Sequence, residues 1–276
     1  MLRLLFAILL SFLSAVSFSQ VYHVEKTNWK DAGYKGNFPS FSNEKNILDF
    51  GGDATNTTSN DSALTAAITA LNVEPGVIYF PAGEYAFRNN INVNRDSLVF
   101  RGAGYDSTRL VFDLGGSLND LISISGTLAV DTTSIVGDAV RGDSVVIVLG
   151  VSGFNVGDWV VLKMNDQAYM FSSWAYGSLS QTIQIKAINA NTITFASPFR
   201  FTFSEANGAY FQKLIPRNNV AIECLAVQRL DATAGQSSNF VFSKAVNCVV
   251  KGIESDSANF AHIEVNGSSS ISITGA

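Results

Sequence analysis

Three side chains near the end of the sequence have the chemistry needed for proton transfer. His262 is one of two histidines in the chain, Glu264 follows it by two residues, and Lys251 precedes both. Imidazole, carboxylate and amine groups commonly serve as general acids and bases. We therefore take His262, Glu264 and Lys251 as candidate catalytic residues. For His262, a solvated or packed imidazole without catalytic function is the alternative.

The same region also has a purely structural interpretation. The strand pattern places Glu223 level with Lys251 on a neighbouring strand, where the two are expected to form a surface ion pair worth about 0.2–1 kcal/mol. Glu254 and Asp256 are expected in the turn that follows Lys251. The sequence contains no tightly spaced aspartate pair, calcium-loop motif or histidine cluster, so any metal ligands stay unassigned.

A second candidate site is the aromatic segment QAYMFSSWAYG, residues 167–177. Its candidate substrate-binding residues are Trp174, Tyr176 and Tyr169, with Phe171 between them. Aromatic faces can stack on sugar rings, but they can equally pack one part of a protein onto another. Both interpretations stay open at the sequence level.

The N-terminus predicts export. Arg3 precedes an apolar run over residues 4–13, and small residues follow at a spacing suited to cleavage after residue 19. A membrane anchor is the alternative, but the run is shorter than a membrane span of about 20 residues. We expect a secreted or cell-surface protein, of bacterial origin, without a membrane span once residues 1–19 are removed. The formal net charge of −5 argues against a nucleic-acid partner.

The elements that position these residues are mostly strands. Residues 20–45 read as an arm that lies on a later surface. After it we expect a strand over Ile47–Phe50, a helix capped by Asn60 or Asp61, and strands over Val77–Phe80 and Tyr85–Phe87. The spacing i, i+3, i+4, i+7 gives the helix an apolar face; its members are Leu64, Ala67, Ile68 and Leu71.

Four motifs follow one another in this segment, and their order is characteristic: ILDFGGDA, NDSA, VIYFPAGEY and LVFRGAGYDSTRLVF. Over residues 46–112 the chain resembles the opening of the pectate-lyase-like superfamily, specifically its rhamnogalacturonase/epimerase-like N-terminal pattern. The resemblance implies an all-β, right-handed parallel β-helix with a short N-terminal capping helix. It also implies that Pro81-Ala82-Gly83 is a structural corner between two sheets.

Internal repetition supports a solenoid independently. A shift of 23 residues aligns FVFSKAVNCVVKGI (240–253) with IEVNGSSSISITGA (263–276), apolar on apolar at alternate positions. The register stacks Asn219, Asn247 and Ser270 at one turn. It also offsets Cys224 from Cys248 along the strands, so we expect free thiols rather than a disulfide.

These patterns divide the chain. Residues 46–125 form the cap and first coils, residues 126–213 a β-meander or barrel-like insertion, and residues 214–276 further coils. The insertion resembles those that some members of the superfamily carry. The strand pattern reaches the last residue, so we expect a fragment of a longer protein.

The resemblance implies a secreted, carbohydrate-active enzyme: a polysaccharide lyase or glycoside hydrolase acting on an acidic, uronate-containing polysaccharide. Calcium is a possible cofactor by the resemblance only. A non-catalytic glycan-binding or cell-surface β-helix is the alternative, because one fold hosts many functions. A tailspike-like structural trimer is a third possibility, which the signal peptide disfavours.

Overall fold

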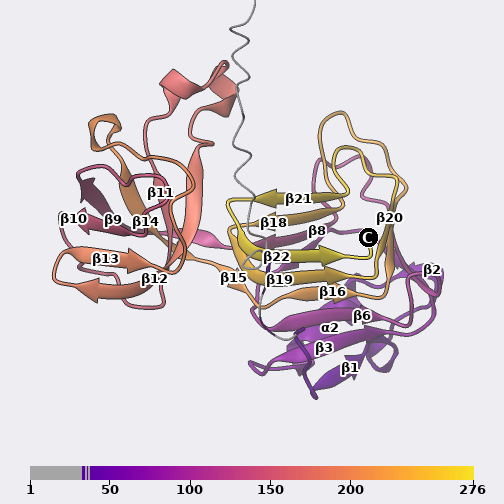
Figure 1. Ribbon diagram of the computed structural model, residues 1–276. Coiled ribbons are helices and arrows are strands. Elements are labelled where there is room, and N and C mark those ends of the chain that lie inside the picture. Colours follow the sequence, from indigo (N-terminus) through magenta and orange to yellow (C-terminus); the bar gives the residue numbers. More distant parts are fainter. Residues whose placement is uncertain (1–32, 35, 37) are drawn as a thin grey trace, which may run out of the picture. The chain divides into compact units, whose positions relative to one another are not determined.

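Each coil of the chain is built from three short strands joined by turns, and successive coils stack strand on strand (Figure 1). The computed structural model describes residues 33–276 except 35 and 37. The predicted signal peptide, residues 1–19, and most of the predicted arm lie outside the described residues. Residues 33–276 form one unit. Within the described part of the chain, no helix is long and apolar enough to cross a membrane.

Parallel pairing of equivalent strands builds the three sheets of the solenoid. The seven-stranded sheet runs β1 (Glu44–Asn46), β3 (Gly76–Phe80), β6 (Leu98–Gly102), β16 (Ala221–Glu223), β19 (Ala245–Lys251) and β15 (Arg217–Asn218), with β22 (Ser269–Thr274) also paired to β19. The five-stranded sheet runs β2 (Thr55–Ser59), β4 (Gly83–Phe87), β7 (Thr108–Phe112), β17 (Ala226–Arg229) and β20 (Glu254–Asp256). The four-stranded sheet runs β21 (Ile263–Asn266), β18 (Phe240–Ser243), β8 (Ile122–Ser125) and β5 (Ile91–Val93).

The inserted strands close into a barrel of order β10, β13, β12, β11, β14, β9. It has its own core, in which Phe195 stacks on Phe211 with ring centroids 4.8 Å apart. Together the sheets and the barrel confirm the predicted fold class, an all-β parallel β-helix with a barrel-like insertion. The barrel strands are β9 (Thr127–Val136), β10 (Val145–Val148), β11 (Trp159–Lys163), β12 (Ser180–Asn189), β13 (Thr192–Phe195) and β14 (Tyr210–Ile215).

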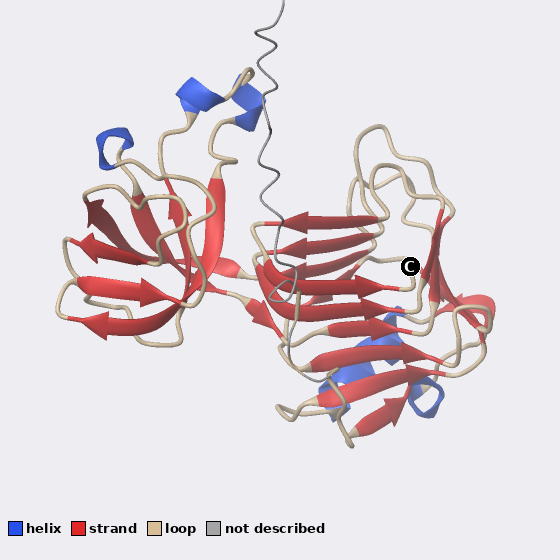
Figure 2. Ribbon diagram, in the orientation of Figure 1, coloured by secondary structure: helices blue, strands red, loops and turns tan. Residues whose placement is uncertain are grey.

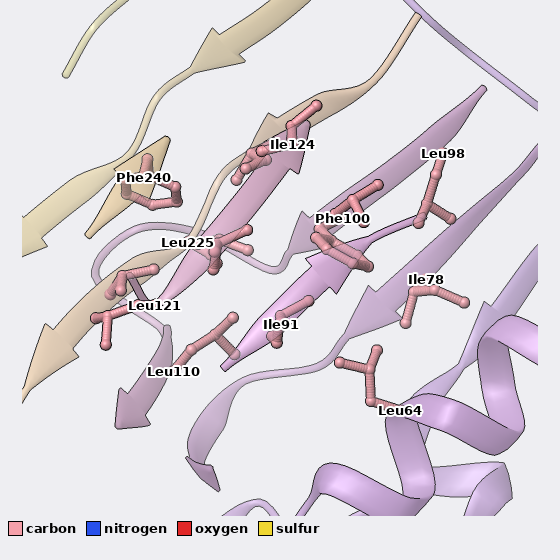
Figure 3. Close-up of a cluster of buried hydrophobic side chains, with 14 of the residues drawn as sticks. Leu64, Ile78, Ile91, Leu98, Phe100, Leu110, Leu121, Ile124, Leu225 and Phe240 are labelled. Carbon is pink, nitrogen blue, oxygen red and sulfur yellow. The ribbon is translucent and has the colours of Figure 1, made fainter. Parts of the chain in front are cut away.

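The core of the solenoid is a stack of aliphatic and aromatic side chains inside the three sheets. Phe100 belongs to one coil and Leu225 and Phe240 to the next, and Figure 3 shows the three side chains pointing into one shared interior. Phe87 and Phe112 stack on consecutive strands of the five-stranded sheet, with ring centroids 5.0 Å apart. Full burial of such a side chain contributes about 1.5–3 kcal/mol, so this stack holds the coils in register.

The predicted repeat register is confirmed. Phe240 pairs with Ile263 and Cys248 with Ile271. The stacked positions Asn219, Asn247 and Ser270 share a left-handed backbone, with φ of 58°, 54° and 56°, a conformation that asparagine tolerates better than most residues. The amides do not bond to one another, because Asn247 donates to Asn218 and Asn219 donates to Ser97.

Both cysteines are free, as the register predicted. Cys248 is fully buried in the core, and burial raises the pKa of its thiol to about 12.

The start of the solenoid differs from the prediction in one place. Residues Ile47–Phe50 form a 3₁₀ helix, η2, instead of a strand. The side chain of Asn46 accepts a hydrogen bond from the amide of Leu48 at 3.0 Å, and Gly51, with φ 85°, ends the turn. Local capping therefore outweighs the strand preference of the apolar run.

The predicted capping helix is α2 (Asp61–Ala70), which buries Leu64 and Ala67 against the first coils. It begins after Asn60, but the buried Asn60 side chain does not cap it. Its amide nitrogen instead donates to the carbonyls of Asp53 and Ala86, and its oxygen accepts from the Asp53 amide at 2.7 Å. Asn60 thereby ties the helix to β4.

The Pro81-Ala82-Gly83 corner joins β3 of the seven-stranded sheet to β4 of the five-stranded sheet, as expected. Gly83 has φ 145°, and a Cβ at this position would lie 2.6 Å from both the Cβ and the carbonyl oxygen of Ala54. Only glycine fits both the backbone angle and the space.

Substitution of Gly83 by alanine is expected to destabilise the fold by about 1–3 kcal/mol, because it adds backbone strain and a contact with the backbone of Ala54. Urea unfolding measures the effect. Gly104→Ala is the matched control: Gly104 has no positive φ, and its close neighbours are side-chain atoms led by the end of Asp106, which can turn away. Equal stability of the two variants would contradict the role given to the corner.

Candidate functional site

The aromatic segment forms a long loop between β11 and β12 of the barrel, which we call the aromatic loop (residues 164–179). Its two 3₁₀ turns, η3 (Gln167–Tyr169) and η4 (Ser173–Ala175), stand clear of the barrel strands, and Figure 2 draws them in blue. Trp174 is 87% exposed and Phe171 is fully exposed, while Tyr169 and Tyr176 are about half exposed. All three predicted substrate-binding residues are therefore at least half-exposed or nearly so on this one loop.

A buried carboxylate holds the base of the aromatic loop. Asp166 is 1% exposed, and its two oxygens accept hydrogen bonds from the amides of Gly177 at 2.8 Å and Leu179 at 2.9 Å. These backbone bonds, Gly177 first, hold the pKa of Asp166 below its usual range. One edge of the loop is fixed as well, because the Tyr169 ring packs edge-on against Phe201 with centroids 5.4 Å apart.

Asp166 was missed by the sequence analysis, although a signal existed. It is the only charged residue between Lys163 and Lys186. A lone charge beside an uncharged aromatic segment indicates a structural role for that carboxylate, because charges are rarely buried without hydrogen-bonding partners.

Replacing Asp166 by asparagine is expected to loosen the aromatic loop, because an amide NH₂ cannot accept a hydrogen bond from a backbone N–H. Exchange of the Gly177 and Leu179 amide hydrogens should accelerate about tenfold or more while the barrel core keeps its protection. The anchor also depends on pH. Since the folded pKa of Asp166 is lowered, the anchor is present above the pKa of the unfolded chain and is lost as the pH falls through the folded value. Unchanged exchange in the variant would rule the anchor out.

The predicted catalytic residues His262 and Glu264 lie together at the start of β21. Nδ1 of His262 is 2.9 Å from the hydroxyl of Ser255, and the buried Asn239 donates to the same hydroxyl at 3.0 Å. The Ser255 oxygen retains its own proton and a lone pair, so it can hold the imidazole in either tautomer. Ser255 thus orients a ring that is itself exposed.

Glu264 has a carboxylate neighbour that the sequence analysis missed. Its Oε2 accepts a hydrogen bond from the hydroxyl of Ser238 at 2.7 Å, and Asp120 accepts from the amide of the same serine at 2.7 Å. The other oxygen of Glu264 accepts from Asn266. The fold therefore brings two carboxylates to one serine, although they are separated by 144 residues in sequence. We call Asp120, Ser238, His262 and Glu264 the carboxylate cluster.

Lys251 does not join this cluster. It ends β19 in the seven-stranded sheet, whereas His262 and Glu264 belong to the four-stranded sheet. Its ammonium group lies over the ring of Phe38, 5.4 Å from the centroid. Phe38 is part of the described arm, which packs on an outward apolar stripe of the seven-stranded sheet that includes Val99 and Val249.

The expected ion pair between Glu223 and Lys251 is absent from the described residues. The two residues are level, as predicted. Arg101, however, lies on β6, the strand on the other side of β16, and its guanidinium bonds to Glu223 at 2.6 Å and to Glu44 at 3.1 Å. A planar guanidinium binds carboxylates with better geometry than an ammonium group, which explains the preference. Glu254 and Asp256, expected in a turn, lie in β20.

Calcium, the cofactor implied by the resemblance, finds no matching site in the described part of the chain. No three histidine, cysteine, aspartate or glutamate side chains gather there so as to hold a metal ion. Asp53, the carboxylate richest in hydrogen bonds, is occupied by the hydroxyls and amides of Thr55, Thr57 and Thr58.

Comparison with known proteins extends these observations. Residues 45–134 match the family model described as rhamnogalacturonase A/epimerase, pectate lyase-like. The match overlaps the segment in which the motifs indicated the resemblance. The chain has the pectate-lyase-like parallel β-helix fold. No curated protein matches the sequence.

Solved structures of similar fold include phage tailspikes. The tailspike of Acinetobacter baumannii bacteriophage AP22, in complex with A. baumannii capsular saccharide, has 16% identity and a TM-score of 0.60 over 80% of this chain. The tailspike of Pseudomonas phage phi297 has 13% identity and a TM-score of 0.57 over 86% of this chain. The chain spans 35% and 49% of the length of these two proteins, and likeness at such identity shows the fold alone.

Proposed function

We propose that this protein is an extracellular, carbohydrate-active protein that binds polysaccharide through the aromatic loop. The observation that carries the proposal is the exposure of Phe171 and Trp174 on a loop held at its base by Asp166. Aromatic side chains bury a large area in any contact, so leaving them in water is a cost that a bound ligand relieves. The apolar face of a sugar ring is a suitable partner for such a surface.

The alternative role for these aromatics, packing the insertion onto the coils, has less support. Residues that pack an interface lose their accessibility, whereas Trp174 keeps 87% of its surface exposed. Rigid aromatic side chains cost little conformational entropy to immobilise, which makes them effective anchors for ligands. A tailspike of similar fold was solved with a capsular saccharide, which is consistent with a polysaccharide ligand here.

Binding is tested by electrophoresis of the protein through gels that contain a uronate polysaccharide, a neutral polysaccharide or neither. Retardation in a polysaccharide gel that increases with the amount of glycan is the expected result. Equal mobility in all gels, for a panel that includes acidic capsular polysaccharides and pectate, would overturn the proposal.

A second candidate function, cleavage of the polysaccharide, is favoured by the carboxylate cluster. Glycoside hydrolysis uses two carboxyl groups that flank the scissile bond, and Asp120 and Glu264 meet at Ser238. In this mechanism one carboxyl group protonates the leaving oxygen as the glycosidic bond breaks. The other accepts a proton from the water that adds to the sugar, so one water is consumed for each cleavage.

Hydrolysis is favoured over elimination by the position of Lys251. Elimination in this fold uses a lysine or arginine base beside the uronate, and the ammonium of Lys251 lies over Phe38, on a different sheet from Glu264. New reducing ends without the ultraviolet absorbance of unsaturated uronate would support hydrolysis. Glu264→Gln and Asp120→Asn should each abolish the reducing ends while binding remains. Unsaturated products, or full activity of both variants, would reject this role for the cluster.

A further inference from the structure

A pair of lysines lies at the base of the aromatic loop. Lys163 is the last residue of β11, directly before the loop, and its cross-strand partner Ser180 is the first residue after it. Val160 and Leu162 point into the barrel core, so the alternating residues Val161 and Lys163 face outward. The Lys163 side chain is only partly exposed.

Lys244 approaches the same outward face from the solenoid. It occupies the turn between β18 and β19 with φ 53°, and its Cγ lies 3.8 Å from where a Cβ on Gly267 would be. Thr182, on the outward face of β12 opposite Val161, donates a hydrogen bond to the Gly267 carbonyl at 2.6 Å. Gly267 is therefore bonded to the barrel and lies beside the Lys244 stem.

The ammonium group of Lys244 donates a hydrogen bond to the hydroxyl of Ser243 at 3.3 Å, a contact that leaves its charge unneutralised. No carboxylate among the described residues forms an ion pair with Lys163 or Lys244, whereas the nearby Lys213 is paired with Asp158 at 2.7 Å. Burial, and then the charge of Lys244, lower the pKa of Lys163. Two partly buried like charges disfavour each other, and an anion between them would convert that repulsion into attraction.

We propose that Lys163 and Lys244 form a binding site for an anionic oxygen group, a carboxylate or a sulfate, of a glycan residue. The inference rests on the proposed function, since it makes the aromatic loop and the lysine pair two parts of one glycan site. Sugar faces stack on the uncharged loop, and the two lysines at its base select an acidic sugar. Charge-assisted hydrogen bonds are the strong ones in such a site.

The test compares a galacturonate oligosaccharide with its methyl ester, which has the same sugar rings without the charge. Lys163→Met and Lys244→Met should each weaken binding of the acid about tenfold, the loss of one charge-assisted hydrogen bond, and leave binding of the ester unchanged. Lys186→Met is the matched control, because Lys186 is an exposed lysine of β12 without a described ion pair. Unchanged affinity for the acid in both lysine variants would overturn the inference while the loop function stands.

An inorganic anion provides a separate arm, in which the protein is titrated with sulfate and the lysine pKa values are followed by NMR of dimethylated lysines. A saturable rise in the pKa of Lys163 and Lys244, absent for Lys186, supports the anion site even if the protein binds no oligosaccharide. In that case the proposed function fails and the site takes a free anion. No response to sulfate or galacturonate overturns the site itself.

Discussion

Replacement of Trp174 by alanine is expected to weaken polysaccharide binding at least tenfold without changing stability. Aromatic anchors of this kind typically dominate a binding energy, with losses of about 2 kcal/mol or more on truncation. Because the side chain is 87% exposed in the free protein, its removal breaks little internal packing. The measurements are isothermal titration with the polysaccharide identified by gel retardation, and the midpoint of urea unfolding.

The control for this prediction is Tyr105→Ala. Tyr105 is another exposed aromatic residue, at 55%, but it lies in the turn between β6 and β7. The Tyr105→Ala variant should bind polysaccharide with the same affinity as the unaltered protein. If both substitutions reduced the affinity equally, or neither did, the aromatic loop would not be the binding surface.

Replacement of Arg229 by methionine is expected to cost about 3–5 kcal/mol of stability, the largest effect we anticipate for a single polar side chain. Its guanidinium is completely buried and bonds to the carbonyls of Asn119 at 2.9 Å and Ser117 at 2.6 Å, and to Asp231 at 3.0 Å. Asp231 in turn accepts hydrogen bonds from the amides of Leu114 and Gly116. One arginine thus joins the loops of two consecutive coils, and its loss leaves the Asp231 charge and several carbonyls unpaired.

The same network predicts sensitivity to acid. Burial alone would raise the pKa of Asp231, but the Leu114 amide and the Arg229 guanidinium outweigh it and hold the pKa below its usual range. This stabilisation is complete above the unfolded pKa of about 3.9 and disappears as the pH falls through the folded value. Asp231→Asn should therefore be less stable at neutral pH and lose less stability on acidification. Parallel stability–pH curves for the variant and the parent would contradict the network.

The repeating part of the fold was accessible from the sequence because strand periodicity and stacking impose the same spacing on each coil. The shift that paired Phe240 with Ile263 depends only on which side chains face inward. The 3₁₀ helix over Ile47–Phe50, which the Asn46 side chain caps, cannot be predicted from that periodicity. It depends on one side chain bonding to the backbone, which apolar patterning does not encode.

The candidate sites were accessible only in part. The aromatic loop was visible as a cluster within one segment, whereas Asp120 and Glu264 come together only because β8 and β21 both pair with β18. Likewise, Glu223 pairs with Arg101 and not with Lys251, because a planar guanidinium binds a carboxylate with better geometry than an ammonium group does. Pairings between distant coils need the three-dimensional register, and their side-chain partners need the rotamers as well.

The most direct test of the central claim is an NMR titration that follows the tryptophan indole N–H groups during addition of the polysaccharide. Trp174 lies on the aromatic loop, whereas Trp159 is a half-buried residue of β11 and serves as an internal reference. The account predicts a saturable shift of the Trp174 resonance, with Trp159 unchanged and the shift abolished in Trp174→Ala. Saturable binding of the polysaccharide that leaves the Trp174 resonance unmoved would contradict it.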